Sequence, residues 1–197
     1  MQYFRESDLD FYFPATWAVR SFDQTKAFKS LSGHGLMGVD FIALTDDGRI
    51  LLLEVKNYRP RYKHDREYRA TRRPPGELAD RVLKKFRDSE RLIRTVNAAL
   101  RRRWWVRTWL RWLHFRRDVS NTYAFWAEAE RRLADPAKRW YGLWMETPER
   151  NTDYDDAVAR HLRRGLAEEC SVFVTENERS ADYPFGIGED NSPHPLP

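Results

Sequence analysis

The sequence predicts an α/β fold in which helices flank a central mixed β-sheet. Three observations lead to this prediction. Apolar segments at residues 38–44 and 49–58 flank a short polar turn, which is typical of a β-hairpin. A longer segment, residues 77–100, carries apolar side chains at helical spacing. After it, segments with helical and strand patterns alternate up to residue 176.

The composition is that of a soluble globular chain. Its 197 residues are 33% charged and 41% hydrophobic, which suits one domain with a real core and argues against wholesale disorder. The net charge is +5, and arginine dominates the basic residues. Guanidinium groups bind two phosphate oxygens at once, so this bias favours nucleic acid as a partner, although a GC-rich coding sequence would produce the same bias.

Cysteine usage and the first residues predict a cytoplasmic protein. The single cysteine, Cys170, excludes an internal disulfide and a cysteine-based zinc site, which fits a reducing compartment. The N-terminal segment carries charges and lacks the apolar region of a signal peptide. No segment is long and uncharged enough to span a bilayer, so we expect no membrane partner.

The N-terminal elements are expected to be a helix followed by two strands. Residues 6–13 predict the helix, with Ser7 as its N-cap and Pro14 after its end. Residues 17–22 alternate between apolar and polar side chains and predict a strand, and residues 26–31 predict another.

The expected hairpin is the clearest pattern in the chain. Its strands are GVDFIAL and RILLLEVKNY, and residues 45–48 form the turn between them. The second strand is a nearly continuous apolar run, as expected for a strand that is covered on both faces, yet it ends in Glu54 and Lys56. Two charges in such a run require an explanation.

The remaining elements predict one domain over residues 1–178, with a helical insertion at about 101–135. Residues 58–76 are rich in arginine and proline and predict a basic loop without regular structure. Residues 179–197 predict a flexible tail. The other expected elements are helices at 77–100, 121–133 and 155–167 and strands at 139–146 and 170–176.

The insertion begins with the unusual segment RRRWWVRTWLRWLHFRR, residues 101–117. Trp105, Trp109 and Trp112 recur on one helical face between arginines. This pattern is typical of core packing or of a contact with a partner, in a homodimer or a larger assembly. A surface that stacks on DNA bases and a helix that lies on a membrane are the other interpretations.

Two carboxylates and an ammonium group are expected to converge on the hairpin. Glu54 and Lys56 lie two residues apart on one strand, so their side chains point to the same face. Pairing through the turn brings Asp40 close to Glu54. Two carboxylates suffice for Mg²⁺, and a metal ion with a nearby cation can stabilise the charge that develops during phosphodiester hydrolysis. The alternative is a structural ion pair at the end of a strand.

At these residues the sequence resembles the PD-(D/E)XK nucleases, whose restriction-endonuclease-like core has the order αβββαβ. The resemblance implies a Mg²⁺- or Mn²⁺-dependent enzyme in which Asp40 and Glu54 bind the metal and Lys56 is catalytic. The Val55 carbonyl is implied as a further ligand. Val39 replaces the family's usual proline. The resemblance also implies an acid from the first helix, for which Glu6 is the candidate and Asp10 and Asp23 are the reserves.

Basic residues are expected to bind the nucleic-acid backbone. Lys85 and Asp88 match positions that recur in small stand-alone bacterial proteins with this core, and the resemblance implies that they orient the site or the substrate. A solvated, charged helix face is the bland alternative and the one that charge pattern alone favours. His34, in a glycine-containing loop before Asp40, is a further candidate for contact with the metal or a phosphate. The expected phosphate contacts are Arg59, Arg61, Lys63, Arg72, Arg73 and Lys85.

The sequence therefore predicts a cytoplasmic, metal-dependent nuclease that hydrolyses phosphodiester bonds, with DNA as the first expected substrate. By analogy, it would serve as the effector of a bacterial defence or repair system. The alternative is a catalytically silent protein with the nuclease fold, which binds nucleic acid or protein through its Trp/Arg-rich helix. No Walker A, GxSxG or GxGxxG motif is present, which argues against nucleotide hydrolysis, esterase chemistry and dinucleotide binding.

Overall fold

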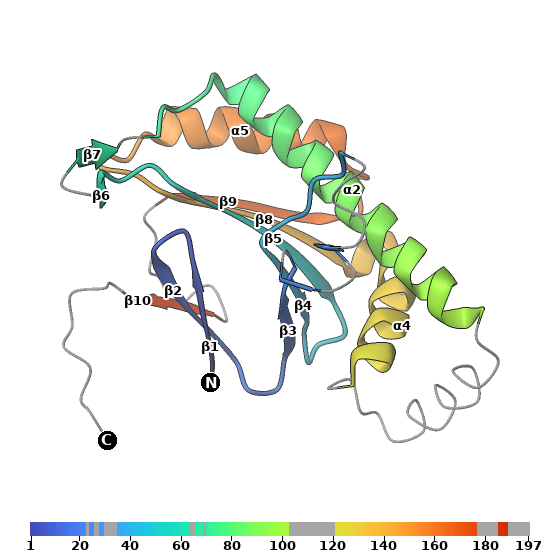
Figure 1. Cartoon of the computed structure of the whole chain (residues 1–197). Coiled ribbons are helices and arrows are strands. Elements are labelled where there is room, and N and C mark those ends of the chain that lie inside the picture. The colour runs from blue at the N-terminus through green and yellow to red at the C-terminus, as the bar shows by residue number, and fades with distance from the viewer. Residues whose placement is uncertain are drawn as a thin grey trace, which may run out of the picture.

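The computed structural model of the chain describes residues 1–22, 24–25, 28–29, 35–63, 66–68, 70–102, 121–176 and 185–188. Within these residues the fold is α/β, with a five-stranded mixed sheet and three α-helices (Figure 1). This agrees with the expected class. No helix among these residues is long and apolar enough to cross a membrane.

The five-stranded sheet has the order β3-β4-β5-β8-β9. The first three strands pair antiparallel, and β5, β8 and β9 pair parallel. Long parallel strands need a crossover connection, which here contains helices. The strands are β3 (Ala18–Ser21), β4 (Phe41–Leu44), β5 (Ile50–Asn57), β8 (Arg139–Glu146) and β9 (Ser171–Glu176).

The expected hairpin is confirmed as β4 and β5. Phe41 pairs with Leu53, and Leu44 pairs with Ile50 at the turn. The turn needs a residue with positive φ, and Gly48 supplies it at 87°. The sheet continues on the other side of β5, and both faces of this strand are buried, which explains its unbroken apolar run.

Helices cover one face of the sheet, as Figure 1 shows for α2 and α5. The core on this side packs Leu78, Val82 and Phe86 of α2 against strand residues such as Ile42 and Leu52. The predicted helices at 77–100, 121–133 and 155–167 are confirmed. They are α2 (Pro75–Arg101), α4 (Thr122–Leu133) and α5 (Thr152–Gly165), and a short 3₁₀ helix, η2 (Pro136–Lys138), follows α4.

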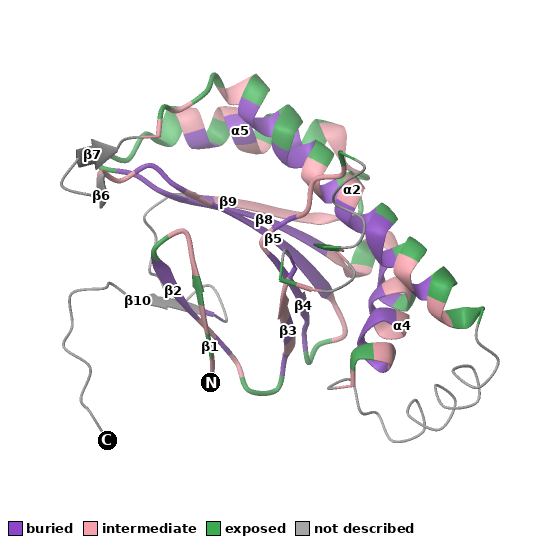
Figure 2. Cartoon of the chain, viewed as in Figure 1, coloured by how far each residue is buried: buried purple, intermediate pink, exposed green. Residues whose placement is uncertain are grey.

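A smaller sheet covers the opposite face (Figure 1). It consists of β1 (Gln2–Glu6), β2 (Leu9–Phe13) and β10 (Gly186–Gly188), in the order β1-β2-β10. Its aromatic side chains pack on the large sheet: Phe11 lies against Phe41 and Trp144, with ring centroids 5.2 and 6.3 Å apart. β5 is consequently buried from both sides (Figure 2).

The N-terminal helix predicted at residues 6–13 is wrong. These residues belong to a β-hairpin, in which Ser7 and Asp8 form the turn with φ values of 53° and 63°. Closely spaced tyrosine and phenylalanine residues favour paired strands over a helix, and Ser7 is a turn residue instead of an N-cap. Of the strand expected at 26–31, the structure describes Phe28 and Lys29 as helical, and the other four residues lie outside the described part.

The basic loop expected at 58–76 contains a small hairpin. β6 (Arg61–Lys63) and β7 (Arg66–Tyr68) pair antiparallel. The prolines of this segment bracket the hairpin without interrupting it, because Pro60 precedes β6 and Pro75 begins α2, where a missing N–H costs no hydrogen bond.

Two other expectations concern segments that are largely outside the described residues. Residues 103–120, which hold the tryptophan stripe, lie outside the described residues. Most of the tail expected at 179–197 lies outside them too. The four residues of that tail that the structure describes, 185–188, belong to the fold. Phe185 is buried against Phe13 and Trp144, and Gly186–Gly188 form β10. Phe185 thus contributes to the core on this face, which a flexible tail would not.

Candidate functional site

Asp40, Glu54 and Lys56 come together at the open end of the β4–β5 hairpin, as the register predicts. Asp40 lies directly before β4, and its N–H donates to the Leu53 carbonyl over 3.1 Å. Its carboxylate Oδ2 accepts the N–H of Val55 over 2.6 Å. The aspartate is therefore attached by backbone and side chain to the strand that carries the other two residues.

Glu54 is the centre of the cluster. Its side chain is completely buried, and Lys56 forms an ion pair with Oε1. Lys85 of α2 contacts both Glu54 oxygens, at 2.7 and 2.8 Å, and lies 3.8 Å from Oδ1 of Asp40. Two carboxylates and two ammonium groups thus share one site, and a buried carboxylate of this kind is stable only with such partners.

Lys85 therefore belongs to the cluster and not to a solvated helix face. Its side chain is 18% exposed, and its ammonium group is directed at Glu54 from a residue 31 positions further along the chain. The sequence singled out Lys85 as a phosphate contact. That contact stays a prediction, and in the structure Lys85 is the second counter-ion of the carboxylates.

Burial and like charge shift the ionisation of Asp40. Its pKa rises from 3.8 to about 7, first because burial disfavours the charged carboxylate and second because Glu54 repels it. Burial by itself would lower the pKa of Lys56, but the charge of Glu54 and the hydrogen bond to it outweigh burial, so this pKa lies above its usual value. A strongly shifted acid beside paired charges is typical of functional sites.

Helix α2 holds the segment that leads into Asp40. The N–H of Met37 donates to Asp88 Oδ2 over 3.0 Å, and the N–H of Val39 donates to the buried Ser89 hydroxyl over 2.9 Å. Between them, Gly38 lies so close to Phe22 and Phe28 that a Cβ there would come within 2.9 and 2.7 Å of their rings. Through its contact with Met37, Asp88 is therefore a residue that positions the backbone leading into Asp40.

Glu6 lies near the cluster, although it comes from a strand and not from a helix. The turn after it contacts the end of β5, where the Asn57 side chain donates to the Ser7 carbonyl over 2.9 Å. The charge of Glu6 contributes to the raised pKa of Lys56. Asp10 accepts the Tyr3 hydroxyl over 2.8 Å, and Asp23 lies outside the described residues, as does His34.

A pocket of about 210 Å³ opens beside the cluster. Glu54, Lys56 and Lys85 line it, and so do Arg73 and Arg81. The sequence predicted Arg73 but missed Arg81. A signal for Arg81 was present, because it lies four residues before Lys85 and therefore on the same face of α2.

The other predicted phosphate contacts have different surroundings. Arg59 forms an ion pair with the buried Glu146 over 2.9 Å. The Arg72 guanidinium lies 5.7 Å from the ring centre of Tyr58 and 4.9 Å from that of Tyr154. These two arginines thus make contacts within the protein. The side chains of Arg61 and Lys63 lie outside the described part of the chain.

Oxygen atoms in the cluster are the candidate metal ligands. Among the residues that the structure describes, no group of three or more histidine, cysteine, aspartate or glutamate side chains is arranged to hold a metal ion. Asp40 and Glu54 provide two carboxylates. Val55 directs its N–H at Asp40, and because the N–H and C=O of a strand residue point to the same side, its carbonyl faces that side too.

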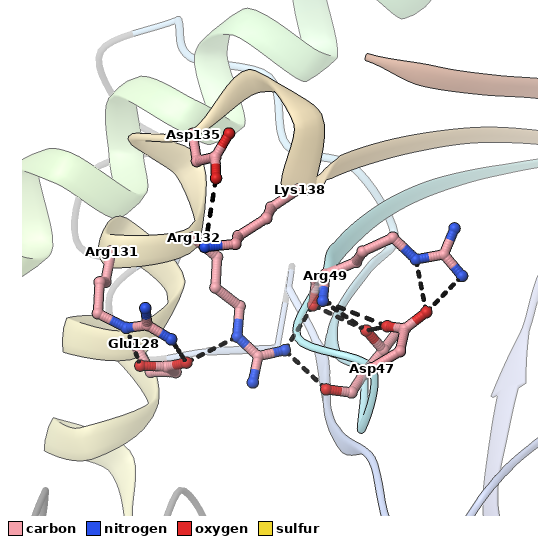
Figure 3. Close-up of polar contacts among 8 residues, drawn as sticks. Asp47, Arg49, Glu128, Arg131, Arg132, Asp135 and Lys138 are labelled. Carbon is pink, nitrogen blue, oxygen red and sulfur yellow. Dashed lines mark hydrogen bonds and ion pairs between the residues drawn. The ribbon is translucent and has the colours of Figure 1, made fainter. Parts of the chain in front are cut away.

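The opposite end of the hairpin is held by a second charged cluster (Figure 3). Arg132 of α4 donates to the carbonyls of Thr45 and Arg49, over 2.7 and 2.5 Å, and to Glu128 over 2.7 Å. Asp47 accepts from the Arg49 side chain over 2.7 Å. Each of these charged side chains has a partner of opposite charge or a carbonyl acceptor, so this cluster anchors the turn.

Comparison with known proteins identifies no relative. No protein-family model matches the sequence, no curated protein matches it, and no solved structure matches the chain. The geometry of the site is therefore the basis for the proposed function.

Proposed function

We propose that this chain is a divalent-metal-dependent phosphodiesterase that cleaves nucleic acid, with DNA as the first substrate to test. One observation carries the proposal. Asp40 and Glu54 converge with Lys56 and Lys85 beside a pocket that two arginines also line. Carboxylates that bind Mg²⁺ and cations that bind phosphate are the two requirements of phosphodiester hydrolysis.

The residues fit Mg²⁺ or Mn²⁺. Such an ion needs only one or two protein carboxylates, because water and substrate phosphate complete its coordination. Asp40, Glu54 and the Val55 carbonyl would hold it, and Lys85 neutralises the same two carboxylates without it. When bound, the ion would lower the pKa of a coordinated water and neutralise charge on the phosphate.

The side chains of the pocket have a separate role in this proposal. Lys56, Lys85, Arg73 and Arg81 place four cations on the wall of the pocket that Glu54 also lines. They attract and orient the phosphate backbone, so binding weakens as salt concentration rises. Lys56, which is paired with the Glu54 carboxylate, is the cation we assign to the reacting phosphate.

We also propose membership of the PD-(D/E)XK superfamily. Support comes from the order β3, β4, β5, α2, β8, α5, β9, in which the residues of the motif lie on β5 and just before β4. The chain departs from the expected core because a hairpin, and not a helix, precedes β3. In this proposal α4 is the end of the Trp/Arg-rich insertion, and a role in defence or repair remains an analogy.

The direct test is degradation of nucleic acid by the purified chain. Plasmid, linear duplex DNA, single-stranded DNA and RNA are each incubated with Mg²⁺, Mn²⁺ or EDTA. We expect cleavage with metal only, and a loss of at least about 100-fold in Glu54→Gln and Lys56→Met. Asp47→Asn, a carboxylate at the other end of the hairpin, is the matched control and should retain activity. Cleavage that survives in Glu54→Gln would refute the proposal.

A second candidate function is binding without catalysis. The observation in its favour is that lysines already neutralise both carboxylates. The protein would then bind nucleic acid through its cationic pocket, or a partner through the tryptophan segment that lies outside the described residues. Retarded migration of nucleic acid with no cleavage in any metal would support it, and Lys85→Met should then weaken binding.

A further inference from the structure

The pocket beside Glu54 and Lys56 has room for one ring system. Its volume is about 210 Å³. An apolar cavity of about 150 Å³ engineered in another protein is large enough to bind benzene. The pocket can therefore receive a single nucleobase, whereas a base pair, with two ring systems and its stacked neighbours, is too large for it.

Apolar side chains form much of the pocket wall. Leu78 and Val82 belong to α2, Met37 lies shortly before Asp40, and Ala70 belongs to the segment before α2. Tyr58 adds an aromatic ring. Such walls suit the faces of a base, which bind aromatic and apolar side chains with little dependence on base identity.

The same pocket carries an excess of positive charge. Four of its lining residues are lysine or arginine. Glu54 is the one lining residue that carries a carboxylate. A ligand that matches both features combines a planar ring with at least one phosphate. A nucleoside monophosphate unit has this chemistry.

The wall of the pocket is held in place by neighbouring elements. The Tyr154 hydroxyl of α5 donates to the Arg73 carbonyl over 2.7 Å. The Arg72 guanidinium contacts the rings of both Tyr58 and Tyr154. These contacts fix the segment that contains Ala70, Thr71 and Arg73, so the pocket exists before a ligand binds, which lowers the cost of binding.

We infer that the pocket binds one unpaired nucleotide of the substrate, with its phosphate toward Lys56 and Lys85 and its base between Tyr58 and the apolar wall. The inference rests on the proposed nuclease function and narrows its substrate. A base in a duplex enters such a pocket only after it leaves its partner, which costs free energy. The preferred substrates are therefore single strands, frayed ends and gaps.

The test is calorimetric titration of the full chain in EDTA, so that no hydrolysis occurs. The probes are the nucleoside 5′-monophosphates, the corresponding nucleosides and inorganic phosphate. We expect the monophosphates to bind at least tenfold more tightly than either phosphate or nucleoside alone. Equal affinity for monophosphate and phosphate, or no binding of any probe, would overturn the inference.

Two substitutions fill the pocket without changing its charge. Ala70→Trp fills it from the wall, and Thr71→Trp fills it from a more exposed position, which protects the test if the first variant is unstable. Each should abolish the tenfold preference for monophosphates. Ala98→Trp, on an exposed part of α2, is the matched control and should retain it. Unchanged preference in both folded pocket variants would also overturn the inference.

Cleavage assays separate this inference from the proposed function. If wild type cleaves nucleic acid with metal but shows no monophosphate preference, the nuclease proposal stands and the pocket inference fails. If monophosphates bind as expected but no metal supports cleavage, the pocket binds nucleotides and the nuclease proposal fails. If both hold, Ala70→Trp should reduce cleavage of single strands at least tenfold.

Discussion

The two ends of the β4–β5 hairpin carry charged clusters of opposite character. At the turn, Asp47 is half exposed and pairs with Arg49, and its pKa is lowered because those contacts outweigh its partial burial. At the open end, burial and Glu54 raise the pKa of Asp40 to about 7. At the turn Asp47 has Arg49 as its own partner, whereas at the open end Asp40 and Glu54 share the ammonium group of Lys85, and Asp40 remains hard to ionise. This difference is the reason why we propose the open end as the functional one.

The largest expected difference between the two ends is in catalysis. Asp40→Asn preserves the shape of the side chain and can still accept the Val55 N–H, but it removes a charge that the proposed metal site requires. Metal-dependent cleavage should fall about 100- to 1,000-fold. Initial rates on labelled DNA measure the effect, with Asp47→Asn as the control. A loss of similar size in both variants would erase the functional distinction.

The next effect concerns stability at the turn end. Arg132→Met retains the aliphatic stem of the side chain but leaves two carbonyls and Glu128 without its guanidinium. We expect a loss of about 3 kcal/mol, because buried acceptors lose charged partners. That loss corresponds to a fall in Tm of about 6–12 °C for a chain of this size.

Arg131→Met is the control for that measurement. Arg131 is 54% exposed and pairs with the same Glu128. Its loss should cost less than about 1 kcal/mol. Calorimetric scans of both variants give the comparison, and equal shifts in Tm would show that the carbonyl contacts of Arg132 do not anchor the turn.

The third effect is a gain in stability when the charge of Asp40 is removed, and its size depends on pH. Asp40 binds its proton more tightly in the folded chain than in the unfolded one, since its folded pKa is raised. Between about pH 4 and pH 7 the folded state therefore holds more protons, and stability falls as pH rises. Asp40→Asn removes this loss, so its Tm advantage over wild type should be small near pH 4 and reach several degrees at pH 8.

Asp47→Asn should behave in the opposite way. The folded pKa of Asp47 is lowered, so its charge contributes stability above the unfolded pKa, and that stability is lost as pH falls. The variant should be slightly less stable than wild type at pH 8 and equal to it at low pH. The same sign for both substitutions at pH 8 would contradict the assignment of the two ends.

The smallest effect is expected for Arg49. Its guanidinium lies 4.4 Å from the ring centre of Trp140 and pairs with Asp47 at the surface. Arg49→Gln should cost less than about 1 kcal/mol, because exposed cation–π contacts and surface ion pairs contribute little. Denaturant titration measures the cost. A loss as large as that of Arg132→Met would show that the surface pair, and not the carbonyl contacts, holds the turn.

The sequence by itself determined the features that depend on local pattern. The alternation of side chains along a strand placed Glu54 and Lys56 on one face, and the short turn brought Asp40 opposite them. The apolar spacing of residues 77–100 identified α2 for the same reason. Periods and turns are properties of neighbouring residues, so they can be recognised without knowledge of the partners.

The tertiary structure decided which distant elements meet. The N-terminal segment, read as a helix, is a hairpin that also pairs with β10 from the far end of the chain. Lys85 reaches Glu54 across 31 positions, and Arg132 reaches the turn across more than 80. These contacts follow from how α2 and α4 pack on the sheet. A local pattern shows that a helix is amphipathic, but only packing determines which of its polar residues meets which charge.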